Sequence, residues 1–495
     1  MTEPTTPQDT PFMLPDGGPP RFTPFDVDPD AYADGNARAA AWTRELSRRL
    51  SQREPSIRRH RAYFAGEQPM RLGSKNWTDA FGDSFGCARN NWMPLVAETA
   101  VARIDLQGFR LDPRDPNPDR DAWEIFQANG LDLHAAQLHL DTIVTGWGYT
   151  LTWPDEHDDP RITVEDPLET IVMRDPADRR RILAGLKSWR DLVGRWHALL
   201  FTPDTVWTLV GGIDGSDERT AIPPQQWTVT KGEDNPLGRV PIVEFINNPD
   251  IHWQGHSDLE PVEPLQDALD KTFADLLIAS EFTAYRQRVL IGGETPIDPT
   301  TKQPITQAEF GIQRLLTLEE GGEIKELEAS DLSNYTGVLE SLKNDVAALT
   351  WTPPQYLLGS MVNISGDALK AAESGLYFRV ARKLKLFGES WKATLRLAFH
   401  VLGLEEMAMT AEVVWRDHET TSEAVRVDAL TKLSTLEVPK VALWEMWGAT
   451  PTMIERWKAE RIEEQIAGGY ALGLTPNGPA VEPAAPEPLP EPIAA

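Results

Sequence analysis

The residues of this chain that most resemble a reaction centre are Gly82-Asp83-Ser84-Phe85-Gly86, which fit the pattern G-x-S-x-G. In serine hydrolases this pattern places a nucleophilic serine on a sharp turn between a buried strand and a helix. The preceding residues, KNWTDAF, do not have the pattern of a core strand. The letters GDS also occur in another esterase class with a late Asp-x-x-His pair, but no histidine here has an aspartate three residues before it. We therefore interpret the match as chance and keep a serine hydrolase using Ser84 as an alternative hypothesis.

Two histidines have a spacing that binds zinc when it occurs on a helix. His252 and His256 are four residues apart, but Trp253 stands where a metalloprotease has its glutamate. The surrounding NNPDIHWQGHSD has the composition of a loop, and His157-Asp158-Asp159 precedes a proline and indicates a turn. The chain also lacks G-x-x-x-x-G-K-[ST], the phosphate-binding loop of nucleotide hydrolases. We predict no catalytic residue, no metal and no cofactor.

Charge and composition restrict the class of protein. The 495 residues include 48 basic and 76 acidic side chains, a net charge of −28, which is too acidic for a protein that coats nucleic acid by neutralising phosphates. With 41% hydrophobic residues the chain has material for roughly three domains. Cys87 is the one cysteine and no apolar run of about 18 residues occurs, so we expect no intramolecular disulfide, no membrane span and a soluble, intracellular protein.

The first half of the chain predicts an α+β domain. Residues 1–36 are a proline-rich tail that we expect to be disordered, and 37–256 form the domain. Helices are predicted at 37–64, with a break at Pro55, at 76–105 and at 121–145. Short β-rich segments separated by turn residues follow. They are Tyr149–Trp153, Ile162–Glu165, Leu168–Arg174, Ile182–Trp189, Trp196–Phe201, Val206–Val210, Gln226–Thr230 and Val240–Ile246.

The first predicted helix is strongly basic in an acidic chain. It carries eight arginines between Arg38 and Arg61, against Glu45 and Glu54. One interpretation is a solvated face paired with acidic neighbours in the fold. The other is contact with an acidic partner or with DNA.

The middle of the chain predicts two helices that flank a small excursion. Residues 257–292 form the first helix, with proline in its opening turn and an end near Gly292. Residues 293–332 contain two strands, Ile312–Leu318 and Glu323–Glu328, joined as a hairpin by EEGG. Residues 333–350 form the second helix. The two helices can therefore stand side by side with the hairpin at their far end.

A loop and a very long helix follow. Residues 351–364 contain two adjacent prolines, which end the preceding helix. The helix at 365–405 is roughly 58 Å long at about 1.5 Å per residue. Its apolar stripe comprises Leu369, Leu376, Val380, Leu384, Phe387, Trp391, Leu395, Phe399 and Leu402. Its polar side carries Lys370, Arg379, Arg382, Lys383, Lys385, Lys392 and Arg396. We expect these to be solvated or paired with acidic neighbours; contact with an acidic neighbouring subunit is the alternative.

The last part of the chain predicts a small helical bundle. Residues 406–470 contain a strand, Ala411–Trp415, and helices near 421–437, 440–447 and 451–467. Residues 471–495 are a second proline-rich tail that we expect to be disordered.

The order of these elements, and several phrases within them, resembles the portal proteins of tailed bacteriophages, in the SPP1-like and actinobacteriophage portal family. The resemblance covers about residues 60–435. Its phrases are Tyr63-Phe64-Ala65-Gly66 with Pro69, Asn91-Trp92 before LVAETAVARIDLQGFR, Trp147-Gly148-Tyr149, Glu165-Asp166-Pro167, Pro241 and Asn247 before GHSDLEPVEPLQDALDK, and TPPQYLLGSMVNISGDALKAAESGL.

The resemblance implies a portal-type architecture and a structural role. The α+β region would be the wing, the paired helices the stem, the excursion the clip and the terminal helices the crown. About twelve copies would form a closed ring at one capsid vertex, through which double-stranded DNA is packaged and ejected. The partners implied are the large terminase, a head-completion or adaptor protein, and the major capsid and scaffolding proteins. The location implied is the virion, after assembly in the host cytoplasm.

The resemblance also implies two sets of contact residues. A tunnel loop facing DNA would include Trp351, Pro353, Pro354, Gln355, Tyr356, Leu357, Ser360, Met361 and Asn363. A clip surface for partner proteins would include Thr295, Lys302, Gln313, Arg314, Glu319, Glu320 and Lys325. Besides the hydrolase, another oligomeric virion adaptor protein with a similar helical centre is an alternative.

Overall fold

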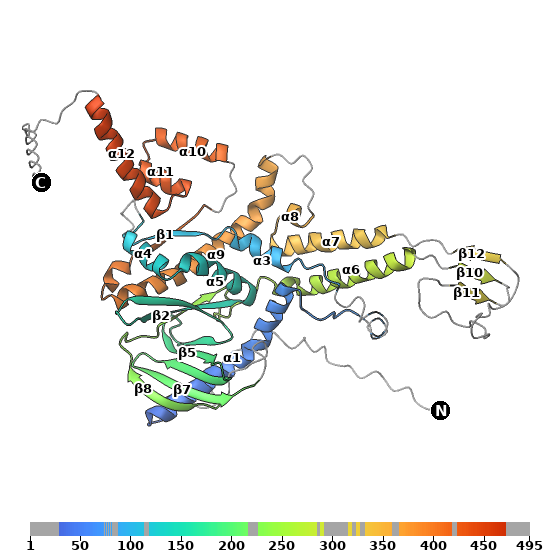
Figure 1. Ribbon diagram of the computed structural model, residues 1–495, viewed down its shortest axis with the longest axis horizontal. Helices are drawn as coiled ribbons and strands as arrows, with labels where there is room; N and C mark the ends of the chain where they lie inside the picture. The colour runs from blue at the N-terminus through green and yellow to red at the C-terminus, as the bar shows by residue number, and fades with distance from the viewer. Residues whose placement is uncertain are drawn as a thin grey trace, which may run out of the picture.

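Two helices project from an α+β body in the computed structural model (Figure 1). The structure describes residues 29–73, 88–112, 118–215, 226–284, 288–291, 315–318, 323–326, 332–358, 366–417 and 423–471, with residues 75, 77, 79 and 81 individually. The mixed helix and sheet content agrees with the predicted α+β class.

The eight strands predicted between residues 149 and 246 are confirmed and form two antiparallel sheets. The three-stranded sheet has the order β3-β2-β9, and the five-stranded sheet is a meander, β4-β5-β6-β7-β8. In the first, Thr150 lies opposite both Val164 and Val243. The strands are β2 (Trp147–Pro154), β3 (Pro160–Glu165), β4 (Thr170–Arg174), β5 (Ile182–Arg190), β6 (Arg195–Phe201), β7 (Thr205–Ile213), β8 (Thr228–Asp234) and β9 (Ile242–Ile246).

The basic helix α1 (Gly35–Ala65) runs unbroken through Pro55, so the predicted break is wrong. Proline removes one hydrogen bond and costs about 3 kcal/mol inside a helix, but α1 packs along its whole length. Its first half buries Trp42 and Leu46 against the five-stranded sheet, and Ile57 joins the cluster around Trp147. Asp34 caps the helix through Ala37 N–H.

The arginines of α1 mostly bind acidic groups of the same chain, as the first interpretation predicted. Arg48 and Arg49 both pair with Glu45 at 2.7 Å. Arg61 bridges Asp141 and Asp166 at 2.9 and 3.0 Å. Arg58 pairs with Glu54, and Arg59 pairs with Glu263.

The first half of the chain also contains helices α3, α4 and α5 and strand β1. The observed bounds of the helices differ from the predicted ones at two places. Residues 88–92 are not helical, and α3 (Met93–Val101) begins at a proline turn before β1 (Leu106–Arg110). The helix predicted at 121–145 is divided into α4 (Arg120–Ala128) and α5 (Leu131–Thr145). Gly130 between them has a φ of +63°, a left-handed conformation that interrupts the helix.

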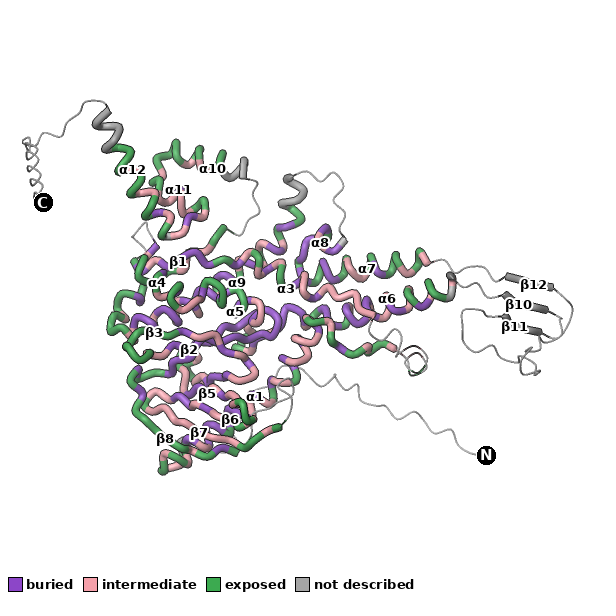
Figure 2. The backbone as a smooth tube through the Cα atoms, in the orientation of Figure 1, coloured by how far each residue is buried: buried purple, intermediate pink, exposed green. Residues whose placement is uncertain are grey.

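The long helix α9 (Gly366–Val401) crosses the body and supplies the centre of its largest core. Seven residues of the predicted stripe are buried, whereas Leu402 is partly exposed and the side chain of Leu369 lies outside the described residues. The buried ones are Leu376, Val380, Leu384, Phe387, Trp391, Leu395 and Phe399. Figure 2 shows the concentration of buried residues where α9 meets the sheet.

The projecting pair consists of α6 (Glu263–Ala284), which follows the short 3-10 helix η2 (Glu260–Val262), and α7 (Ser333–Thr350). They lie side by side because Leu269 and Phe273 of α6 share an apolar cluster with Leu339 and Val346 of α7. Figure 2 shows exposed residues along their outer faces.

The far end of the pair differs from the predicted hairpin. The first helix ends at Ala284, not near Gly292, because Arg288–Ile291 forms strand β10. This strand is the centre of a three-stranded sheet, parallel to β11 (Leu315–Leu318) and antiparallel to β12 (Glu323–Glu326). The two predicted strands therefore flank β10 and do not pair with each other.

The last part of the chain follows the prediction. Strand β13 (Glu412–Trp415) pairs with β1, and helices α10 (Glu423–Thr435), α11 (Lys440–Trp447) and α12 (Pro451–Ala471) come after it. Short helical turns η1 (Pro29–Ala31), α8 (Pro354–Leu358) and η3 (Glu405–Ala408) complete the described elements. The described helices include none with the length and apolar character needed to span a membrane.

The buried, neutral His139 in the main core predicts how the free energy of unfolding depends on pH. Trp391 Nε1 donates to His139 Nε2 at 2.9 Å, and the imidazole stacks on Phe387. Burial lowers the pKa of His139 to about 3, whereas an unfolded histidine titrates near pH 6.5. Between these values only the unfolded state binds the proton, so the free energy of unfolding falls as pH falls, by about 1.4 kcal/mol per pH unit.

The measurement is urea unfolding between pH 7.5 and 4.5, for the parent chain and His139→Gln. Glutamine keeps an acceptor for Trp391 but does not titrate, so we expect the variant to lose this part of the pH dependence. Equal slopes for the two proteins would contradict the role of His139.

Candidate functional site at the base of the projecting helices

Residues 351–358, which follow α7, are positioned first by the way α7 ends. Trp351 takes a left-handed conformation with a φ of +55°, and its N–H still bonds to Ala347 O. The N–H of Thr352 bonds to the same carbonyl at 3.1 Å. Pro353 and Pro354 follow, and neither can donate a backbone hydrogen bond, so the helix stops here.

The turn α8 is held against α9 by a tyrosine. Tyr356 Oη donates to Glu373 Oε1 at 2.7 Å and accepts from Arg103 at 3.2 Å. Arg103 also pairs with Glu373 at 3.3 Å. Burial, together with the Glu373 carboxylate, raises the pKa of Tyr356. The phenol therefore stays a hydrogen-bond donor and joins α8 to the first part of α9.

Arg379 of α9 binds three different parts of the chain. Its Nη1 donates to Thr350 O at the end of α7, and its Nη2 donates to Val96 O in α3, both at 2.9 Å. Its Nε donates to Asp258 Oδ2 at 2.8 Å. One guanidinium thus fixes the end of α7 relative to α3 and to the segment that leads into α6.

Lys383, one turn further along α9, completes a buried ion cluster with Asp258 and Arg379. Its side chain is fully buried, and its Nζ lies 2.8 Å from Asp258 Oδ1 and 2.5 Å from Asn247 Oδ1. Burial alone would raise the pKa of Asp258, but Lys383 and Arg379 hold it well below its usual range. Burial lowers the pKa of Lys383 to about 8, and Asp258 opposes that shift.

A second polar network fixes α6 to the body. Tyr63 Oη donates to Asp267 at 2.8 Å, Gln68 donates to Asp270 at 2.7 Å, and His60 contacts Glu263 at 2.6 Å. Burial raises the pKa of Asp267 and of Asp270. The inward side of α6 near the body is therefore polar and makes directional contacts, which sequence periodicity alone did not indicate.

The predicted tunnel-loop residues differ in exposure. Trp351, at 55%, and Pro354 are exposed. Tyr356 is partly buried, and Pro353, Gln355 and Leu357 are buried. Ser360, Met361 and Asn363 lie outside the described residues, so their role stays a prediction.

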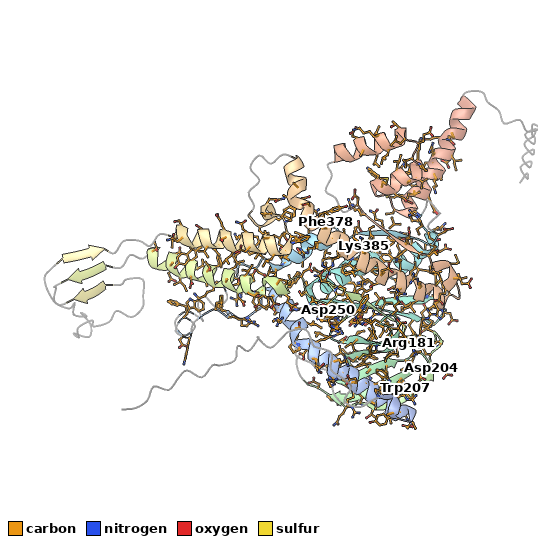
Figure 3. All side chains as sticks on the ribbon, turned by 180° about the vertical axis from the view of Figure 1, so that it is seen from behind. Arg181, Asp204, Trp207, Asp250, Phe378 and Lys385 are labelled. Atoms are coloured by element: carbon orange, nitrogen blue, oxygen red, sulfur yellow. The ribbon has the colours of Figure 1, made fainter. Side chains whose placement is uncertain are left out.

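Two exposed apolar side chains near Trp351 were missed from the sequence. Leu349 and Phe378 are 57% and 62% exposed. A Cβ on Gly375 would lie 3.2 Å from Trp351 Cβ, so this glycine lets the tryptophan approach α9 one turn before Phe378. Figure 3 shows Phe378 and Lys385 along α9. The sequence did contain a signal for an exposed apolar group on this helix, because Phe378 is a phenylalanine that lies outside the predicted apolar stripe.

The other predicted residues are placed as follows. Lys325 lies in β12 opposite Val289 of β10, whereas Thr295, Lys302, Gln313, Arg314, Glu319 and Glu320 lie outside the described residues. Ser84 and its motif also lie outside them.

His252 is in a turn in which Asp250 accepts from its backbone N–H, so the histidine pair is not helical. The described residues contain no group of three or more His, Cys, Asp or Glu side chains arranged for a metal ion.

Comparison with known proteins identifies the class. A family model described as "Phage portal protein, SPP1 Gp6-like" matches residues 88–467. The portal proteins of Mycobacterium phages D29 and L5 are each 30% identical to this chain over 361 residues, which cover 68% of this chain and 71% of theirs. The class is thus that of phage portal proteins, structural components of the virion, and the matches give no support to a hydrolase using Ser84. The chain belongs to the SPP1 Gp6-like portal family, as the resemblance predicted.

The buried ion cluster gives a stability prediction. Asp258→Asn leaves the fully buried Lys383 and the largely buried Arg379 without a counter-charge, and we expect it to lower the free energy of unfolding by about 3–5 kcal/mol. Adding Lys383→Met to this variant removes one of the uncompensated charges and should restore part of the loss. The measurement is urea denaturation at pH 7.

The matched control is Glu389→Gln on the outer side of the same helix. Glu389 pairs with Lys392, but its side chain is 70% exposed, so solvent screens the pair and its loss should change stability little. An effect of Asp258→Asn as small as that of the control would contradict the importance of the cluster.

Proposed function

We propose that copies of this chain form a closed ring, of about twelve subunits in this family, at one vertex of a phage capsid. Double-stranded DNA passes through the central channel of the ring during packaging and ejection. Family membership supports this function. The structural observation that supports it most strongly is the helix pair α6–α7. This pair projects from the body, and the turn α8 is fixed at its base (Figure 1).

Within this proposal each part of the chain has a place in the ring. Residues 37–256 are the wing, α6 and α7 are the stem, and 293–332 with β10 are the clip. The long helix α9 crosses the wing, and 406–470 supply strand β13, which returns to the wing by pairing with β1, and the helices of the crown. The clip binds the large terminase first and a head-completion protein later, and the wing and crown meet capsid and scaffolding proteins.

The segment 351–364 is the proposed tunnel loop. Among the residues of this segment that the structure describes, Trp351 and Pro354 are exposed, and neither side chain is charged. The chain as a whole has a net charge of −28. Affinity for DNA comes mainly from cations that neutralise phosphates. An uncharged lining on an acidic protein therefore suits a channel in which DNA slides. The buried Gln355 and Leu357 hold the turn in place and do not face the DNA.

The ring is tested by electron microscopy of negatively stained, purified protein. Head-to-tail contacts that close by rotation give rings with a central hole. We expect such rings, and a monomer that persists at high protein concentration would contradict the proposal.

The tunnel loop is tested by Trp351→Ala in a phage that depends on this chain. The side chain is exposed, so ring assembly and unfolding temperature should be unchanged while the yield of DNA-filled heads falls. This substitution is sharper than deletion of the loop, which would also remove the buried Gln355 and Leu357.

The control for that experiment is Trp253→Ala, a partly exposed tryptophan in the turn before α6. It should leave packaging unchanged. Normal packaging by Trp351→Ala would argue that residue 351 does not face the channel.

A further inference from the structure

The three helices α10, α11 and α12 do not bury a complete apolar core. Among their described side chains Leu443 and Ile454 are buried. By contrast Val427, Leu436 and Ile462 are each more than half exposed, and Trp447 is 48% exposed. Where such exposed apolar side chains gather on one surface, another segment often packs there.

Two of these exposed side chains, Val427 and Trp447, line a groove of about 570 Å³ between the three helices. Val427 and Leu430 of α10, Trp444 and Trp447 of α11, and Trp457 of α12 line it. The Trp457 ring lies 5.6 Å from that of Trp444 and 5.9 Å from that of Trp447, inclined by 69° and 50°. Inclined indole faces form apolar slots, which are the surfaces that receive proline rings in complexes with polyproline II segments.

Residues 472–495 of the same chain have the matching composition. They contain seven prolines, three glutamates at 482, 487 and 491, and no basic residue. Polyproline II is a preformed extended conformation and loses little entropy when it docks in an aromatic groove. The margin of the groove carries Glu460, Arg461 and Glu464. Glu460 pairs with Arg456, and Arg461, which makes no ion pair with the residues that the structure describes, can receive one of the glutamates of the segment. The match therefore comes mainly from the prolines and the indole rings, with one charge contact at Arg461.

The connection favours this segment as the occupant. It begins directly after Ala471, the last residue of α12, and that helix supplies Trp457 and Arg461. From Arg461 to Ala471 the helix rises about 15 Å. The 24 residues that follow span about 74 Å in polyproline II form, which is enough to turn back along the groove. A short covalent link gives a high effective concentration at the site.

The other proline-rich part of the chain, 1–28, is less well placed. It joins the described residues at Pro29, ahead of α1, and Gly35 at the start of α1 lies against Trp207 of β7. Figure 1 shows these elements across the body from α10–α12.

We propose that residues 472–495 bind, as a polyproline II segment, in the tryptophan-lined groove of α10–α12. This intramolecular docking completes the core of the terminal helices. It follows from the groove and the chain connection, and it does not depend on the ring proposed above.

The test uses the chain truncated after Ala471 and a fluorescein-labelled peptide of residues 472–495, with binding measured by fluorescence anisotropy. We expect saturable binding to the truncated chain. Binding to the full chain should be weaker, since its own segment already occupies the groove. Trp447→Ala in the truncated chain should weaken binding by about tenfold, and Arg461→Glu by about threefold.

Two controls distinguish binding in this groove from nonspecific binding of the peptide. Phe378→Ala removes an exposed aromatic side chain on α9, outside the groove, and should leave the affinity unchanged. A labelled peptide of residues 1–28 should bind far more weakly. No saturable binding, equal binding of the two peptides, or no effect of both Trp447→Ala and Arg461→Glu would overturn the proposal. Loss of self-association in Trp447→Ala, without peptide binding, would instead assign the groove to a second copy of the chain.

Discussion

One buried ion cluster fixes the end of α7, from which residues 351–358 continue. Asp258, Arg379 and Lys383 lie where α9 passes the entry to α6, and the cluster reaches α3 and the end of α7 through Arg379. A buried carboxylate between two cations is costly to disrupt because removing one partner leaves unpaired charge in a medium of low dielectric constant. The geometry at the base of the projecting helices is therefore fixed by a few directional contacts.

The polar contacts of α6 with the end of α1 and with Gln68 just after it extend the same constraint. Glu263, Asp267 and Asp270 face His60, Tyr63 and Gln68, while Leu265, Leu269 and Phe273 of the same helix belong to the apolar cluster that contains α7 residues. One side of α6 is thus fixed to the body by hydrogen bonds, and another side packs on α7 through apolar contacts. In a portal subunit this arrangement would hold the stem at a set angle to the wing and present Trp351 and Pro354 at a constant position.

The sequence predicted the elements whose signals are local. The strands between residues 149 and 246 and the stripe on α9 were found because alternation and helical spacing repeat within a few residues. The break at Pro55 was wrong because packing of α1 on two sheets outweighs the cost of proline. The strand β10 was missed because its partners lie more than 20 residues away.

For the site, the prolines at 353 and 354 indicated the end of α7. The burial of Lys383 could not be foreseen, because Asp258 is 125 residues distant in sequence and a lysine on the polar side of a helix is usually solvated.

The central claim is that copies of this chain enclose a pore whose narrow part is lined by the turn after α7. Its most direct test is a cryo-electron microscopy map of the assembled protein at a resolution that shows tryptophan side chains. The account predicts a ring in which Trp351 and Pro354 face the central axis, with α6 and α7 of each copy packed beside those of its neighbours. A map that places these two residues on the outer circumference would contradict it.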